Sequence, residues 1–141
     1  MGREGPCRRA QDPKITYPIV EYGQMDPLFQ PNSAAIGGLV YRNTRIQQLT
    51  NLLIFGDNPS GEIFYVNADN LPKGGQDAIR RILLSDNGTL KTFLQVIKDK
   101  NAAQGKPIAT RADLRFAEGP DGRIFLLNKR DGAIRELVPW Q

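Results

Sequence analysis

The stretch 113–138 constrains the fold more than any other part of the sequence. Its three short apolar runs are separated by two turn signals, GPDG at 119–122 and KRDG at 129–132. Asp-Gly between apolar runs favours a tight hairpin, because glycine adopts positive φ without steric cost. The stretch therefore predicts a three-stranded antiparallel meander with strands of about five residues, a common strand length.

The sequence before this meander contains further strand candidates, at 35–41, 52–55, 62–66, 78–84 and 89–93. The glycine pair at 37–38 in the first of them predicts either a bulge or the close approach of another backbone. Residues 90–98 also place Leu90, Phe93, Leu94 and Ile97 at helical spacing, so a short helix is the alternative there. The stretch 15–22 is β-prone, but Pro18 limits it to an edge strand or an extended segment. We therefore expect an all-β chain with at most one short helix.

An internal similarity points to a repeated unit. Residues 53–67 align without gaps on residues 114–128, with seven identical residues. Two unrelated β-hairpins can share such residues, since both need a turn and an apolar return strand. The other interpretation is a tandem pair of four-stranded antiparallel sheets at about 35–84 and about 89–138, and such repeated sheets are typical of β-propeller blades.

Two blades cannot close a propeller ring, which typically has four to eight. A fragment of a longer propeller, spanning 15–141, is therefore favoured over a protomer that completes a ring by assembly and over an independent two-sheet β-sandwich. Residues 1–14 are charged, contain Pro6 and Pro13 and show no periodicity, which predicts an irregular lead-in.

Composition excludes several kinds of function. The chain has no histidine, which excludes histidine-based acid–base catalysis and most zinc sites within it. One cysteine, Cys7, allows no internal disulfide. No apolar run approaches the ~20 residues of a membrane span, and the N-terminus lacks the apolar region of a secretory signal. The net charge of +4 is dispersed along the chain, so we expect a solvated surface and no nucleic-acid partner.

Four stretches together resemble the C-terminal end of the glucose/sorbosone dehydrogenase family, at 36–42, 53–64, 113–122 and 127–135. These proteins are six-bladed β-propellers related to soluble quinoprotein glucose dehydrogenase and the aldose sugar dehydrogenases. The resemblance spans roughly residues 18–138 and corresponds to the last third of a full family member. It implies that this chain is about two four-stranded blades of a six-bladed ring.

The resemblance also implies a function. The parent protein would oxidise a sugar with pyrroloquinoline quinone (PQQ) held over the central face of the ring, in the periplasm or outside the cell. In the family, a catalytic histidine and the Ca²⁺-binding loops lie in earlier blades. This chain alone is therefore expected to be inactive, and the sugar and the remaining blades would be partners of the parent protein.

Three arginines are the candidate cofactor ligands by the same resemblance. Arg42 follows a Val-Tyr pair, where the family has a basic cofactor contact, and its guanidinium could pair with a quinone carboxylate. Arg111 lies near the family's Arg-x-Arg-Asp strand entry but is shifted by one residue, which in a strand reverses its face. Arg115 would share a strand face with Arg111 and Asp113. The competing interpretation is a non-catalytic propeller or β-sandwich scaffold that binds carbohydrate or protein.

Overall fold

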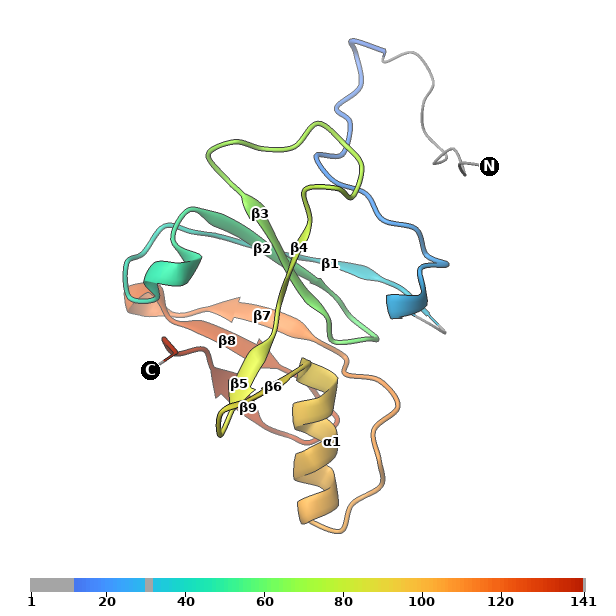
Figure 1. The fold of residues 1–141 in the computed structure, drawn as a ribbon, viewed down its shortest axis with the longest axis vertical. Coiled ribbons are helices and arrows are strands. Elements are labelled where there is room, and N and C mark those ends of the chain that lie inside the picture. Colours follow the sequence, from blue (N-terminus) through green and yellow to red (C-terminus); the bar gives the residue numbers. More distant parts are fainter. Residues whose placement is uncertain (1–11, 30–31, 141) are drawn as a thin grey trace.

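The computed structural model describes residues 12–29 and 32–140, which form antiparallel sheets and one α-helix (Figure 1). Sheet 1 contains β1 (Ala35–Tyr41), β2 (Leu52–Asp57), β3 (Ile63–Asn67) and β4 (Arg80–Ile82), hydrogen-bonded in that order. A hairpin of β5 (Leu84–Asp86) and β6 (Thr89–Lys91) leads into helix α1 (Phe93–Ala103). Sheet 2 contains β7 (Arg115–Glu118), β8 (Ile124–Leu127) and β9 (Ile134–Glu136). Short 3₁₀ helices lie at Pro27–Phe29 (η1), Gln47–Leu49 (η2) and Pro120–Gly122 (η3).

The chain is mostly β-structure in antiparallel sheets, as predicted, and the C-terminal meander is confirmed as β7, β8 and β9. The glycine pair at 37–38 forms the expected irregularity in β1, whose register with β2 shifts between Ile36 and Leu39. A Cβ atom at Gly38 would lie 1.6 Å from the carbonyl oxygen of Ile54. Only glycine therefore allows β1 to pass this close to β2.

The prediction that 89–93 forms a strand of the second sheet is wrong. Only 89–91 is extended, and it pairs with β5. Thr92 then caps α1: its hydroxyl accepts a hydrogen bond from the backbone N–H of Gln95, and the Gln95 side chain accepts one from the N–H of Thr92. Phe93 and Ile97 are buried on one side of the helix. The helical alternative is thus confirmed with later bounds, and sheet 2 has three strands instead of four.

The aligned segments 53–67 and 114–128 both form hairpins, but with different registers. Phe55 lies opposite Phe64, whereas Phe116 lies opposite Leu126 and not opposite the aligned Phe125. The second turn is one residue shorter, since it closes with a bond from the N–H of 119 to the carbonyl of 123 while the first joins 57 to 62. The expected tandem copy is therefore not reproduced in the pairing of the strands, and the described residues form no closed ring.

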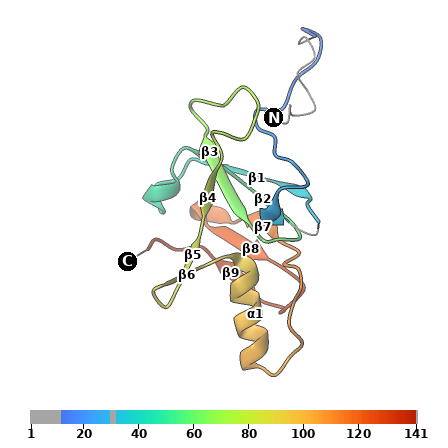
Figure 2. The ribbon, with the colours of Figure 1, turned by 45° about the vertical axis from the view of Figure 1, so that its right-hand side comes forward.

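The two sheets pack against each other through their inner faces. Ile54 and Ile63 of sheet 1 share a buried core with Leu114, Ile124 and Leu126, and α1 contributes to it. The sheets lie side by side in both views, with α1 next to sheet 2 (Figures 1 and 2). Strands β1 and β7 contact each other although they belong to different sheets. The inner core is thus shared between the two meanders.

The outer face of sheet 1 is covered by the N-terminal segment 15–29. Phe55, Phe64 and Val66 form a second core with Phe29, and Val20 and Tyr22 pack on it. The stretch 15–22 forms no regular strand, consistent with Pro18, but backbone hydrogen bonds join it to residues 74–75. The predicted lead-in at 1–14 lies outside the described residues except for 12–14.

Gly61 provides a test of how tightly the two sheets are joined. Its φ is +72°, and an added Cβ would lie 2.7 Å from the Cβ of Ala112. Gly88 has a similar φ of +81° but faces open space. We expect Gly88→Ala to lower the free energy of unfolding by about 1 kcal/mol and Gly61→Ala by about 3 kcal/mol, because only the second adds a clash. Chemical denaturation measures both, and equal losses would contradict the close approach.

Candidate functional site

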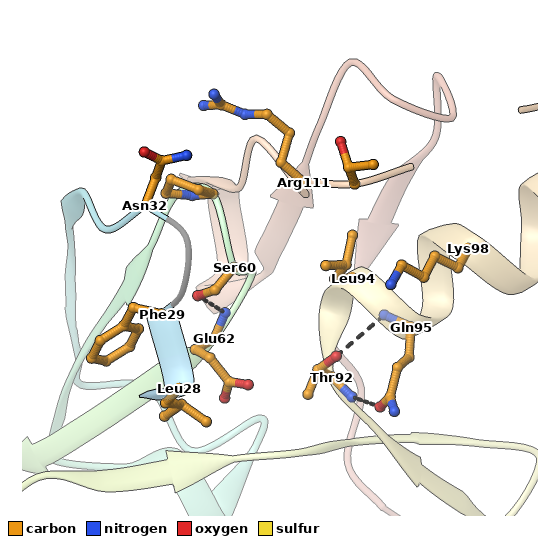
Figure 3. A pocket seen from close by; sticks show the side chains of 12 residues that line it. Leu28, Phe29, Asn32, Ser60, Glu62, Thr92, Leu94, Gln95, Lys98 and Arg111 are labelled. Atoms are coloured by element: carbon orange, nitrogen blue, oxygen red, sulfur yellow. Dashed lines mark hydrogen bonds between the residues drawn. The ribbon is translucent and has the colours of Figure 1, made fainter. Parts of the chain in front are cut away.

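A cleft of about 320 Å³ lies where the two sheets and α1 meet (Figure 3). Its size falls at the lower end of small-molecule sites. Four parts of the chain form its walls: η1 with Asn32, the β2–β3 turn, the first turns of α1, and residues 110–111. The lining side chains are Leu28, Phe29, Asn32, Pro59, Ser60, Glu62, Thr92, Leu94, Gln95, Lys98, Thr110 and Arg111.

The β2–β3 turn is fixed by a buried carboxylate. Asp57 is fully buried, and its oxygens accept hydrogen bonds from the hydroxyl of Ser33 at 2.9 Å, the N–H of Ala34 at 2.7 Å and the hydroxyl of Ser60 at 2.7 Å. These donors come from the turn itself and from the segment before β1. Because a buried carboxylate needs such donors, this network holds one wall of the cleft in a single conformation.

The same turn binds the chain segment that precedes sheet 2. The N–H of Ala112 donates to the carbonyl of Pro59 at 2.7 Å, and the N–H of Leu114 donates to the carbonyl of Asn58 at 3.0 Å. The Asn58 side chain also donates to the carbonyl of Leu114 at 2.9 Å. These bonds place Arg111 at the edge of the cleft, next to the turn (Figure 3).

Arg111 is held by two acceptors but remains accessible. Its Nε lies 2.6 Å from Asp113, and one terminal nitrogen donates to the Asn58 side chain at 3.0 Å. The side chain is still 43% exposed. Arg130 binds the other oxygen of Asp113 at 2.5 Å, so two guanidinium groups share one carboxylate. Arg111, Arg130 and Asp113 together therefore carry a net charge of +1 at this edge of the cleft.

The pKa of Asp113 reflects these two neighbours. Burial alone would raise the pKa of this carboxyl, but the hydrogen bonds from Arg130 and Arg111 outweigh burial and lower the pKa below its usual value. Asp113 also adopts a positive φ of 53°. This left-handed conformation turns its carboxylate toward both arginines and interrupts the strand before β7 begins.

The other two charged groups of the cleft differ in whether a neighbouring charge neutralises them. Glu62 is nearly buried, and its two oxygens bind Arg81 at 2.8 Å each, so its charge is neutralised. Lys98 is half-buried, and its amine has no ion-pair or hydrogen-bond partner among the described residues. Arg111 and Lys98 thus stand on two sides of a cleft whose net charge is positive (Figure 3). The arrangement suits a small anion such as a carboxylate.

The structure does not bring the three predicted arginines together. Arg42 donates to the Asn51 side chain at 2.9 Å and pairs with Asp69. Asn51 precedes β2 and Asn58 follows it, so the partners of Arg42 and Arg111 lie about 20 Å apart at ~3.3 Å per residue. Arg42 and Arg111 are therefore at opposite ends of sheet 1, beyond the reach of one small ligand.

Arg115 lies at a third location, on β7 of sheet 2. It lies opposite Leu127, and because the neighbouring Leu126 faces the inner core, Arg115 and Leu127 lie on the outer face of sheet 2. Its guanidinium donates to the carbonyl of Leu114 at 2.8 Å. The expectation that Arg115 shares a strand face with Arg111 is wrong, since the positive φ of Asp113 breaks the alternation between them.

Sequence reasoning missed Lys98 and Asn58. Lys98 follows Leu94 by four residues, so the helical alternative for 90–98 would have placed both on one face. No local pattern marks Asn58, whose contacts come from residues more than fifty positions away. Within 12–29 and 32–140, no group of three or more histidine, cysteine, aspartate or glutamate side chains is arranged to hold a metal ion. In the same residues, no helix has the length and apolar character needed to cross a membrane.

Comparison with known proteins adds no relative: no family model, no curated protein and no solved structure matches this chain.

The shared carboxylate predicts a pH dependence of stability. Because the folded-state pKa of Asp113 is lowered, its stabilising contribution is present above the unfolded pKa of about 3.9 and is lost as the pH falls through the folded value. We expect Asp113→Asn to lower the free energy of unfolding at pH 7 by about 2 kcal/mol. The variant should also lose less stability than the unaltered chain as the pH falls below about 4. Asp121→Asn, in an exposed turn, is the control, and an equal acid profile in both variants would refute the ion pairs.

Proposed function

We propose that this chain is a two-sheet segment of a β-propeller of the glucose/sorbosone dehydrogenase type. The observation that supports this most is the stacking of two antiparallel meanders through their inner faces, with β1 and β7 in contact. Propeller blades also pack face to face, but each places its front on the back of the next, whereas here equivalent faces of the two hairpins meet, as in a two-sheet sandwich. The catalytic groups, the Ca²⁺ site and most of the sugar site would belong to the remaining blades of an exported parent protein.

Within this proposal, the cleft is the part of the chain that serves the cofactor. PQQ supplies the redox chemistry of sugar oxidation and carries carboxylates. Arg111 fits a carboxylate, because it keeps exposed surface and shares its counter-ion with Arg130. Lys98 offers a second cation across the cleft. Arg42 and Arg115 lie elsewhere, so the proposed cofactor contact rests on Arg111 and Lys98.

A non-catalytic scaffold is the second candidate. The internal bonds of Arg111 to Asp113 and Asn58 favour it, since they satisfy much of the guanidinium without a ligand. In a scaffold, the same bonds would serve only to join the two sheets. The two proposals therefore differ in whether the cleft binds an anionic quinone.

Titration of the chain with PQQ distinguishes them. We expect saturable binding that Arg111→Gln weakens about tenfold, the effect of one charge-assisted hydrogen bond of ~1.4 kcal/mol. Arg42→Gln is the matched control, because it removes an equal charge from the opposite end of sheet 1 and should leave binding unchanged. Dye-linked aldose oxidation should be undetectable with this chain alone.

Two results would count against the quinone proposal. One is the absence of saturable PQQ binding by the unaltered chain. The other is equal weakening by Arg42→Gln and Arg111→Gln, which would indicate a nonspecific effect of net charge. Either result would favour the scaffold.

A further inference from the structure

The outer face of sheet 2 is apolar and remains partly exposed among the described residues. Phe125 and Leu127 are half-buried on it, and Ile134, which lies opposite Leu127, is 68% exposed. The chain after β9 also exposes Val138, at 66%, and Trp140, at 72%. Contiguous exposed apolar surface of this kind marks an interaction site.

The equivalent face of sheet 1 shows what kind of segment packs on such a surface. Phe64 and Val66 align with Phe125 and Leu127, and they also point away from the shared core. They are 3% and 1% exposed in a cluster to which the segment 15–29 contributes Val20, Tyr22 and Phe29, together with Leu53 and Ile79. The ring centroids of Tyr22 and Phe29 lie 5.9 and 5.7 Å from that of Phe64. An irregular aromatic segment, not a further strand, therefore covers this type of face.

Charge adds a second constraint on the partner. The covering segment 15–29 carries two acidic residues, Glu21 and Asp26, and no basic one. The outer face of sheet 2 carries Arg115 on β7, and the guanidinium of Arg123 lies 5.7 Å from the ring centroid of Phe125. Neither arginine has an acidic partner among the described residues.

The acidic residue on this face, Glu136, does not neutralise the two arginines. Glu136 is already paired with Arg45 at 3.1 Å. The two unpaired arginines therefore leave the outer face basic as well as apolar. A partner with acidic side chains beside its apolar ones would complement it.

We propose that the outer face of sheet 2 binds an extended, acidic and aromatic segment of the kind that 15–29 forms on sheet 1. Aromatic and aliphatic side chains would cover Phe125, Leu127 and Ile134, and carboxylates would pair with Arg115 and Arg123. The surface is separate from the cleft at Arg111, so this proposal does not depend on quinone binding. In a closed propeller ring a further blade would cover this face, so this proposal agrees with the scaffold candidate and differs from the propeller candidate.

The single tryptophan provides the readout, because Trp140 is exposed and follows β9 of this sheet by four residues. The probe is a synthetic peptide with the sequence of residues 15–29. We expect a saturable blue shift of the tryptophan emission as peptide is added to the full chain. Ile134→Asp should weaken binding at least tenfold, and a peptide with lysine at both acidic positions should bind more weakly than the native peptide.

Leu90→Asp is the matched control, since Leu90 is 54% exposed on the β5–β6 hairpin and should leave binding unchanged. Circular dichroism of each variant shows whether it remains folded. The proposal is overturned if the emission does not respond to peptide or if folded Ile134→Asp responds like the unaltered chain. A blue shift that grows with protein concentration alone, with a dimer in sedimentation, would also overturn it, because the occupant would then be a second copy.

Discussion

The structure depends on the attachment of the β2–β3 turn to the segment that enters sheet 2. Backbone and side-chain bonds join Asn58 and Pro59 to Ala112 and Leu114, across more than fifty residues of intervening chain. Buried backbone groups at this junction have no water to bind, so these hydrogen bonds fix the relative position of the sheets. The apolar core between the inner faces supplies most of the stabilisation, but the hydrogen bonds decide how the faces meet.

The same junction determines the chemistry of the cleft. It places Arg111 at an edge where Asp113 is shared with Arg130, and it brings α1 close enough for Lys98 to face the same space. A cationic cleft therefore results from the way that the sheets are joined. The outer face of sheet 2 has a different origin, since it is the side of the last meander that faces away from the junction.

Much of the fold could be predicted from the sequence because its signals are local. The Asp-Gly turns predicted the C-terminal meander, and the paired glycines predicted the bulge in β1. Residues 89–98 carried both a strand pattern and a helical pattern. The Thr92–Gln95 capping box and burial of Phe93 and Ile97 decided for the helix after β6 ended. The apparent repeat failed in register because its two turns differ in length by one residue, which an ungapped alignment cannot reveal.

The candidate site was less predictable than the fold. By itself, the sequence determined that the chain is largely antiparallel β-structure and lacks histidine-based chemistry, since turn propensity and composition act without long-range contacts. Only the tertiary structure decided which arginine faces a cleft. Arg42, Arg111 and Arg115 are chemically equal in the sequence, and their separation follows from sheet ends, a positive φ at Asp113 and pairing across distant segments.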